Sequence, residues 1–218
     1  MLKRLLLGLT FLSSIAFASE SLTTDSQIKS LYEQLHLKNK LDYSTFSQAI
    51  KGYNKIPNKK EGKITIVDFA KPSNEERFFV IDLENKKIDY STYVAHGKNT
   101  GTVSAIKFSN VTNSFQSSLG FFLTANPYEG NNGYSLRLKG LEPGINSNAF
   151  RRNIVIHGAD YATKEFIEKY GFLGRSLGCP AIPTEISKEV IDYIKEGTVL
   201  YIHGDDSEYF EKSVYASL

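Results

Sequence analysis

The strongest constraint on the fold is a change of pattern at Lys63. From there to about residue 203, short runs rich in β-branched and aromatic residues alternate with loops rich in Gly, Asn and Ser. We expect strands at residues 64–69, 77–83, 88–95, 120–124, 134–138, 154–157 and 198–203, and helices at 163–170 and 184–196. The predicted fold class is therefore mainly β with short helices (α+β).

The segment before Lys63 has a helical pattern in two parts. Apolar residues recur at the spacing of one helix face, first over residues 28–35 and then over residues 43–53. The N-cap candidates are Asp25 or Ser26 for the first helix and Asp42 for the second. Residues 54–62 have the composition of an exposed linker.

The first eighteen residues have the three-part pattern of a secretory signal peptide. A basic start precedes an apolar run from Leu5 to Phe17, and Ala-Phe-Ala is typical of a cleavage site. This run is shorter than the roughly 20 residues of a membrane span, although an uncleaved anchor helix is the alternative. We therefore expect export to the periplasm or cell envelope of a bacterium, without stable membrane insertion after cleavage. The expected parts are a signal peptide (1–18), a helical region and linker (19–60), a main domain (61–204) and a C-terminal tail (205–218).

Charge and cysteine content exclude several classes of protein. The chain has 26 Lys and Arg against 24 Asp and Glu, and removal of residues 1–18 would change its net charge from +2 to zero. A neutral chain has no electrostatic attraction to nucleic acid, so we expect no such partner. The single cysteine excludes an intrachain disulfide and a cysteine-cluster zinc site.

His157 and Cys179 are the residues best suited to chemistry. His157 ends an apolar run and is followed by Gly158, and Cys179 lies in a Ser-Leu-Gly-Cys-Pro bend. An imidazole that takes the thiol proton makes the sulfur a nucleophile near neutral pH. Backbone N–H groups near Gly178 would stabilise the oxyanion formed by attack on a carbonyl. The alternative is a buried structural cysteine, but the flanking Gly and Pro favour a bend over a regular core element.

The other histidines are less informative. We expect His36 at the surface and His203 in a structural role. His96 ends a predicted strand as His157 does, and it either lines the same cleft or caps the strand. A zinc site of His157, His203 and Cys179 has suitable ligand types but no closely spaced pair, so we expect no metal.

Seven short motifs follow one another between about Lys63 and His203. They are DFAKPS (68–73), VAHG (94–97), FSN (108–110), SSLG (117–120), YSLRLKGLE (134–142), IHG (156–158) and GRSLGCPA (174–181). Each is weak alone, but together and in this order they are specific. The chain resembles the L,D-transpeptidase catalytic domain (YkuD-like) family, in its murein L,D-transpeptidase branch.

The resemblance implies a β-sandwich or barrel around a cysteine nucleophile, in exported enzymes that remodel peptidoglycan stem peptides. It implies that Cys179 is the nucleophile and His157 the general base, oriented by a backbone carbonyl of Gly158 or a neighbour. Ser176 and Gly178 match the frame of the motif. No cofactor is implied, and β-lactams of the carbapenem type are expected to acylate the cysteine.

The chain departs from the family pattern in two places, before and after the cysteine. Leu177 stands where many members have a histidine, and Pro180 and Ala181 follow the cysteine where many have Arg or Asn. Substrate contacts made by those groups must come from elsewhere in this chain. The substrate-binding candidates are Arg175, Arg152, Gly158 and His96.

The expected function is acyl transfer from a stem peptide through a thioester on Cys179. If an amine from another stem peptide resolves the thioester, the product is a cross-link; if water does, the enzyme is an L,D-carboxypeptidase. A non-catalytic wall-binding module and a thiol protease are alternatives of other classes. The chain lacks the local cysteine signature of the papain group.

Overall fold

In the computed structural model, which describes residues 24–216, eight strands form one sheet in the order β3-β2-β1-β8-β4-β5-β6-β7. The strands are β1 (Lys63–Asp68), β2 (Phe78–Asp82), β3 (Lys87–Thr92), β4 (Gly120–Gly130), β5 (Gly133–Gly140), β6 (Val155–Gly158), β7 (Ala181–Ile182) and β8 (Val199–His203). The helices are α1 (Asp25–Gln34), α2 (Tyr43–Lys55), the 3-10 turn η1 (Asp160–Ala162), α3 (Lys164–Tyr170), α4 (Thr184–Ile194) and α5 (Ser207–Lys212). The predicted fold class is confirmed. The signal-peptide prediction lies outside the described residues.

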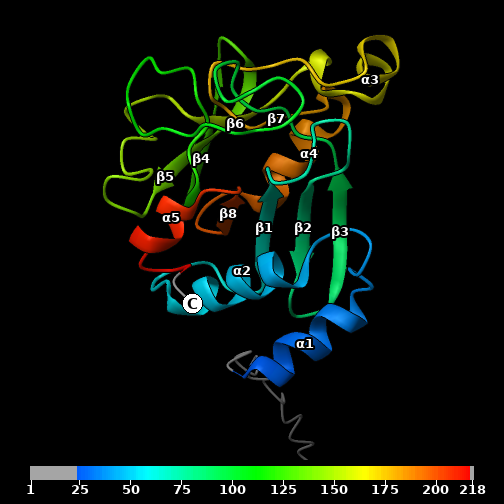
Figure 1. Ribbon diagram of the computed structural model, residues 1–218, viewed down its shortest axis with the longest axis vertical. Helices are drawn as coiled ribbons and strands as arrows, with labels where there is room; N and C mark the ends of the chain where they lie inside the picture. The colour runs from blue at the N-terminus through cyan, green and yellow to red at the C-terminus, as the bar shows by residue number, and fades with distance from the viewer. Residues whose placement is uncertain (1–23, 217–218) are drawn as a thin grey trace, which may run out of the picture.

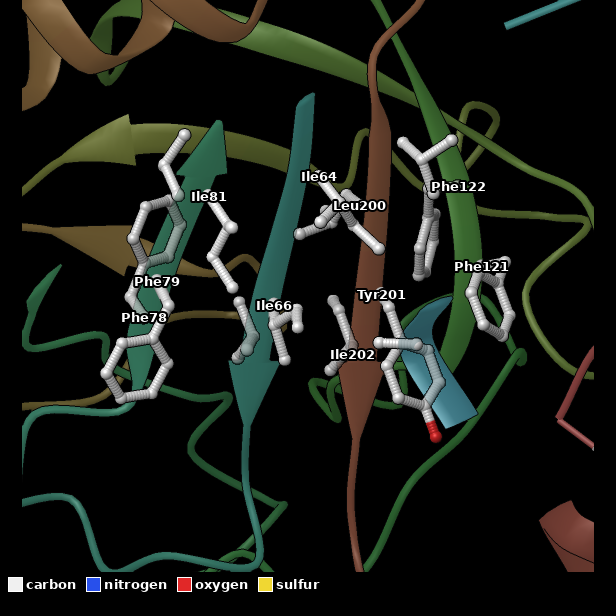
Figure 2. Close-up of a cluster of buried hydrophobic side chains, with 14 of the residues drawn as sticks. Ile64, Ile66, Phe78, Phe79, Ile81, Phe121, Phe122, Leu200, Tyr201 and Ile202 are labelled. Atoms are coloured by element: carbon white, nitrogen blue, oxygen red, sulfur yellow. The ribbon is translucent and has the colours of Figure 1, made fainter. Parts of the chain in front are cut away.

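Strands β1, β2 and β8 form the apolar centre of the molecule. Every residue of β2 and β8 is buried, and in β1 only the first residue is not. Continuous burial is expected of strands that are covered on both faces. Figure 2 shows the isoleucine, leucine and aromatic side chains of these strands packed together with those of β4.

The N-terminal helices pack into the same core as the sheet. In Figure 1, α1 and α2 lie at one end of the molecule, and β6, β7 and α3 lie at the other. Gly52 of α2 faces the ring of Phe121, where a Cβ would stand 2.1 Å from Cζ. In the segment expected to be an exposed linker, Ile56 is buried and the Lys60 N–H donates to Gly197 O at 2.7 Å. This segment is therefore fixed to the sheet domain.

The N-cap of α1 differs from the prediction. It is Thr24, whose hydroxyl accepts from the Gln27 N–H at 3.2 Å while the Gln27 side chain accepts from the Thr24 N–H at 3.1 Å. This reciprocal capping box satisfies two backbone donors at once, so the choice of Asp25 or Ser26 was wrong. Asp42 occupies the N-cap of α2 as predicted, but its side chain makes no capping hydrogen bond.

The segment predicted as a C-terminal tail contains α5 and is anchored by Glu142. This buried carboxylate accepts from the Phe121 N–H at 2.7 Å and from the Ser213 hydroxyl. Burial raises the pKa of Glu142, and these donors oppose the rise. A buried polar contact therefore ties residues after α5 to the start of β4.

Strand β4 continues to Gly130, beyond the predicted end at Thr124. A shift of register between Thr124 and Pro127 lets the strand pass a proline that would otherwise interrupt it. A tight turn then pairs Gly130 with Gly133 and leads into β5. Helix α4 packs against β5 and β6, and it therefore covers one face of this part of the sheet.

Candidate active site

The pairing of β6 with its neighbours decides which side chains share a face. His157 pairs with Ser135 on β5 and with Ala181 on β7. The next residue, Gly158, faces α4, because a Cβ there would stand 2.5 Å from Ser187 Oγ. Successive side chains of a strand alternate between faces. His157 therefore points away from α4, together with Ser135.

Cys179 lies beside the beginning of β6, two residues before Ala181. Its Sγ lies 3.5 Å from Asn153 O, to which the thiol donates, and the Val155 N–H donates to the sulfur. Val155 precedes His157 by two residues on the same strand. The fold thus brings the sulfur and the imidazole to neighbouring positions along β6. The hydrogen-bond partners of the sulfur are backbone groups and not the imidazole.

The imidazole of His157 is oriented by the backbone carbonyl of Gly158. Its Nδ1 lies 2.8 Å from Gly158 O. A carbonyl only accepts, so Nδ1 carries the hydrogen and Nε2 keeps a free lone pair. Gly158 therefore positions the histidine and packs under α4. The predicted orientation of the histidine by the Gly158 carbonyl is confirmed, and a contact of Gly158 with substrate stays a prediction.

Burial keeps both groups neutral at neutral pH. Cys179 is 8% exposed and His157 is 4% exposed. Burial raises the pKa of the Cys179 thiol, although the Val155 N–H and the charge of Arg152 act in the opposite direction. Burial also lowers the pKa of His157, against the effect of Gly158 O. The resting pair is therefore a thiol and a free base, and not a thiolate with an imidazolium.

The bend from Ser176 to Cys179 is closed by a side-chain hydroxyl. Ser176 Oγ donates to Cys179 O at 2.6 Å and accepts from the Gly178 N–H at 3.0 Å. Gly178 has a φ of +122°, and a Cβ there would stand 2.8 Å from Gln116 O, so glycine is required. Because the Gly178 N–H already donates to Ser176 Oγ, this group is not available to an oxyanion, and stabilisation by other N–H groups near Gly178 stays a prediction.

Ser117 also belongs to the site, although no local pattern marks it as a functional residue. Its Oγ donates to Gly178 O at 3.1 Å and accepts from the Gly97 N–H at 3.0 Å. Gly97 also pairs with Ser176 through an isolated bridge. Three separate segments are thereby fastened around the cysteine. The only sequence signal was the motif at 117–120, in which the serine had no assigned chemistry.

His96 lies beneath the bend and is buried. It is 1% exposed, with Nδ1 at 2.8 Å from an Nη of Arg77 and Nε2 at 3.2 Å from Gly101 O. Burial and the Arg77 charge lower the pKa of His96 to about 4. Its backbone carbonyl accepts from the Ser176 N–H at 2.9 Å. The predicted substrate contact is therefore corrected: His96 and the fully buried Arg77 support the loop of the bend.

The two arginines predicted to bind substrate differ in their surroundings. Arg152 directs its N–H groups into the loop at 109–118, and its charge is close enough to lower the pKa of Cys179. Its acceptors are Ser109 O, Ser118 Oγ, Ser114 Oγ and Gln116 O, at 2.5–3.1 Å. Arg152 therefore holds this loop beside the cysteine instead of pointing into open space. Arg175 is exposed next to the bend, and its contact with substrate stays a prediction.

The other candidates lie away from this face. His203 is on β8, which β4 and β5 separate from β6 in the sheet, so it does not join His157 and Cys179. Within residues 24–216, no three His, Cys, Asp or Glu side chains gather in a way that could hold a metal ion. No helix in that range is both long enough and apolar enough to cross a membrane.

Solved structures of L,D-transpeptidases are distantly similar to the chain. The enzyme of Mycobacterium smegmatis is 12% identical, with a TM-score of 0.40 over 66% of this chain and 59% of that one. The L,D-transpeptidase of Stackebrandtia nassauensis is 14% identical, with a TM-score of 0.40 over 84% and 78%. The helical cell shape determining protein Pgp2 of Campylobacter jejuni is 10% identical, with a TM-score of 0.45 over 66% and 48%. The chain thus spans about 59% of the length of the M. smegmatis enzyme.

A search of curated protein sequences gave no match. The family model described as L,D-transpeptidase catalytic domain matches residues 37–203. This range includes β6, β7 and the whole bend that carries Cys179. It also includes α2, so the family resemblance begins earlier than the expected start near Lys63. The chain belongs to the L,D-transpeptidase catalytic domain family.

Proposed function

We propose that this protein is an exported cysteine acyltransferase that acts on peptidoglycan stem peptides as an L,D-transpeptidase. The observation that carries the proposal is the position of Cys179 beside the start of β6. Val155 contacts the sulfur, and His157 lies two residues further along the same strand. Family membership supports the reaction class. The signal-peptide pattern of residues 1–18 supports export.

In the first step, Nε2 of His157 takes the proton of Cys179 and the sulfur attacks a substrate carbonyl. We assign this carbonyl to the L,D bond after the third residue of a stem tetrapeptide. The bond to D-alanine breaks, the amine leaves with the proton held by His157, and a thioester remains. The neutral resting pair suits this order, because the base is free before the thiol is ionised.

The oxyanion donor that we assign is the backbone N–H of Cys179 itself. The described residues supply no acceptor for this N–H, whereas that of Gly178 is held by Ser176. A donor next to the attacking sulfur is within reach of the oxygen on which charge develops. Ser176 and Gly178 act by fixing the bend, and Arg152 acts by favouring the thiolate.

In the second step, an amine of another stem peptide attacks the thioester, His157 takes the proton of the amine and returns it to the sulfur as the C–S bond breaks, and the new amide bond is the cross-link. Water in place of the amine gives an L,D-carboxypeptidase, which shares every step up to the thioester. The cysteine is buried near the bend, and exclusion of water favours the amine. No step requires a metal or an organic cofactor.

Intact-mass measurement with a carbapenem tests the thioester step. We expect the purified protein to gain the mass of one carbapenem, and Cys179→Ala to gain none. Lys29→Gln, at an exposed position of α1, serves as a matched variant that keeps the sulfur and is expected to be acylated. If the unaltered protein gains no mass, a non-catalytic wall-binding module is the better description.

Product analysis with a disaccharide-tetrapeptide separates the two enzymes. Cross-linked dimers indicate transpeptidation, and tripeptides without dimers indicate carboxypeptidase activity. Cleavage of peptides made only of L residues would instead indicate a thiol protease. Mass spectrometry reads the first two outcomes from the disaccharide-tetrapeptide reaction and the third from a separate reaction with the all-L peptides.

A further inference from the structure

Three side chains form a stack on the sheet face that carries His157. They are Tyr128 of β4, Arg137 of β5 and Phe150 of the loop between β5 and β6, and we call them the arginine platform. The Arg137 Cζ lies 3.9 Å from the centroid of the Tyr128 ring and 5.6 Å from that of the Phe150 ring. Tyr128 and Arg137 are half-buried, and Phe150 is 54% exposed. The stack is therefore open to solvent on the Phe150 side.

The register of the sheet fixes which face the platform occupies. Tyr128 pairs with Ser135, and Ser135 pairs with His157, so these three residues form one row across β4, β5 and β6. Paired residues of neighbouring strands project from the same face. The platform and the imidazole therefore lie on the face opposite α4.

Arg137 belongs to the next row of the same face. It pairs with Val155, whose N–H donates to Cys179 Sγ. Arg137 and Cys179 thus lie on opposite sides of one residue of β6. With strands about 4.8 Å apart, their backbones are separated by roughly 10 Å. The guanidinium lies against a ring that comes from β4 and not from β6, so a stem peptide must extend from the sulfur across this face to meet its N–H edge.

The platform contains a cation without an acidic partner. None of the ion pairs among the described residues involves Arg137. Rings on the faces of a guanidinium leave its N–H edge available, and that edge binds a carboxylate through two parallel hydrogen bonds. Such a cation without an ion-pair partner is available to a ligand that carries a carboxylate.

We propose that Arg137, held between Tyr128 and Phe150, binds a free carboxylate of the stem peptide next to the bond that Cys179 attacks. This inference rests on the proposed function. Two carboxylates qualify: the C-terminal one of D-alanine, and the one on the side chain of the third residue where that residue is a diaminodicarboxylic acid. Both present the same chemistry to the guanidinium, and amidation distinguishes them.

Binding measurements in a Cys179→Ala background test the proposal without turnover. Calorimetry would give the Kd of the tetrapeptide and of two analogues, each with one of the two carboxylates amidated. We expect Arg137→Gln to weaken tetrapeptide binding about 10- to 100-fold, and Arg137→Lys to restore part of the loss. One of the two amidated analogues should bind the protein that keeps Arg137 as weakly as the unmodified tetrapeptide binds Arg137→Gln. The Arg137→Gln change should not weaken the binding of that analogue any further.

Lys139→Gln is the matched control, because Lys139 is an exposed cation two residues along on the same strand and face. It should leave all three dissociation constants within about twofold. The proposal is overturned if Arg137→Gln binds the unmodified tetrapeptide as tightly as the protein that keeps Arg137. It is also overturned if both amidated analogues bind as tightly as the unmodified tetrapeptide. Carbapenem acylation is measured separately on the protein with Cys179. Its failure would remove the proposed function, while the binding series still decides whether Arg137 holds the carboxylate.

Discussion

The two halves of the sheet are built on different principles. In β1, β2 and β8, nearly every side chain is buried, and apolar packing on both faces holds the strands together. In β5, β6 and β7, α4 covers one face, and the other face carries His157 and Arg137 beside Cys179. Individual hydrogen bonds from loops organise this second half. Substitutions in the first half should therefore change the free energy of unfolding, and those in the second half should change reactivity.

His157→Ala should produce the largest effect and test the second half of the sheet. Loss of the general base should lower kcat/KM for tetrapeptide by roughly 10²–10⁴-fold. The melting temperature should fall by only a few degrees, because the buried imidazole leaves a small cavity and makes one hydrogen bond, to Gly158 O. Rates from mass spectrometry and melting curves from circular dichroism would measure the two effects. A large fall in melting temperature with an unchanged rate would reverse the contrast between the halves.

Phe79→Ala should have the opposite signature in the first half. Phe79 lies on β2 with no exposed surface, so truncation leaves a cavity and should cost about 3–5 kcal/mol of unfolding free energy. Ile106→Ala is the control, because Ile106 is 68% exposed and should change stability by less than about 0.5 kcal/mol. Urea unfolding would measure both. Acylation of Cys179 in the folded fraction should be unaffected by either change.

Acidification should weaken the protein through groups in both halves. Burial lowers the pKa of His96 and of His203 to about 4, and burial raises the pKa of Asp68 to about 6. As pH falls from about 6.5 to 4, the unfolded chain therefore binds more protons at both histidines than the folded chain does, which favours unfolding. At Asp68 the folded chain binds the extra proton between about pH 6 and 4, which favours folding. Two histidines outweigh one carboxyl, so the net loss should be about 2–4 kcal/mol.

Unfolding free energies measured at pH 7, 5.5 and 4 would show this loss. His96→Asn should flatten the profile, because it removes one of the two buried histidines. His36→Asn, at an exposed position, should leave the profile unchanged. Stability that increases on acidification would mean that Asp68 dominates.

Arg152→Gln should have the smallest of these effects and acts within the second half alone. The charge of Arg152 lowers the pKa of Cys179 against the larger effect of burial. Its removal should slow alkylation of Cys179 by iodoacetamide about tenfold at pH 8. Arg152→Lys keeps the charge and should lose less. If Cys179 is alkylated at the same rate in Arg152→Gln and in the unaltered protein, the role of Arg152 is limited to its hydrogen bonds with the loop at 109–118.

Sequence patterns anticipated the first half well and the second half in part. The strands β1, β2 and β8 follow from runs of β-branched and aromatic residues, whose burial does not depend on distant partners. The extension of β4 was missed because Pro127 resembles the end of a strand unless a bulge accommodates it. The cap at Thr24 was missed because two adjacent polar residues competed for the same position.

The site shows the same division between local and non-local information. His96 and His157 stand in the same sequence context, a histidine at a strand end followed by glycine. They differ because Arg77, nineteen residues before His96, forms a hydrogen bond with the imidazole of His96 in the interior of the protein. The contacts of Ser117 and of the arginine platform were likewise not predictable from local patterns, because their partners come from other strands and loops.

By itself, the sequence determined the β-rich fold class, the resemblance to the family and the identity of Cys179 and His157 as the pair to examine, because short-range patterns and motifs carry that information. Only the tertiary structure decided that the Gly178 N–H is occupied, that His96 is buried and that Arg137 stands across Val155 from Cys179. These facts depend on strand register and on contacts between segments far apart in the chain, and no local pattern encodes such contacts.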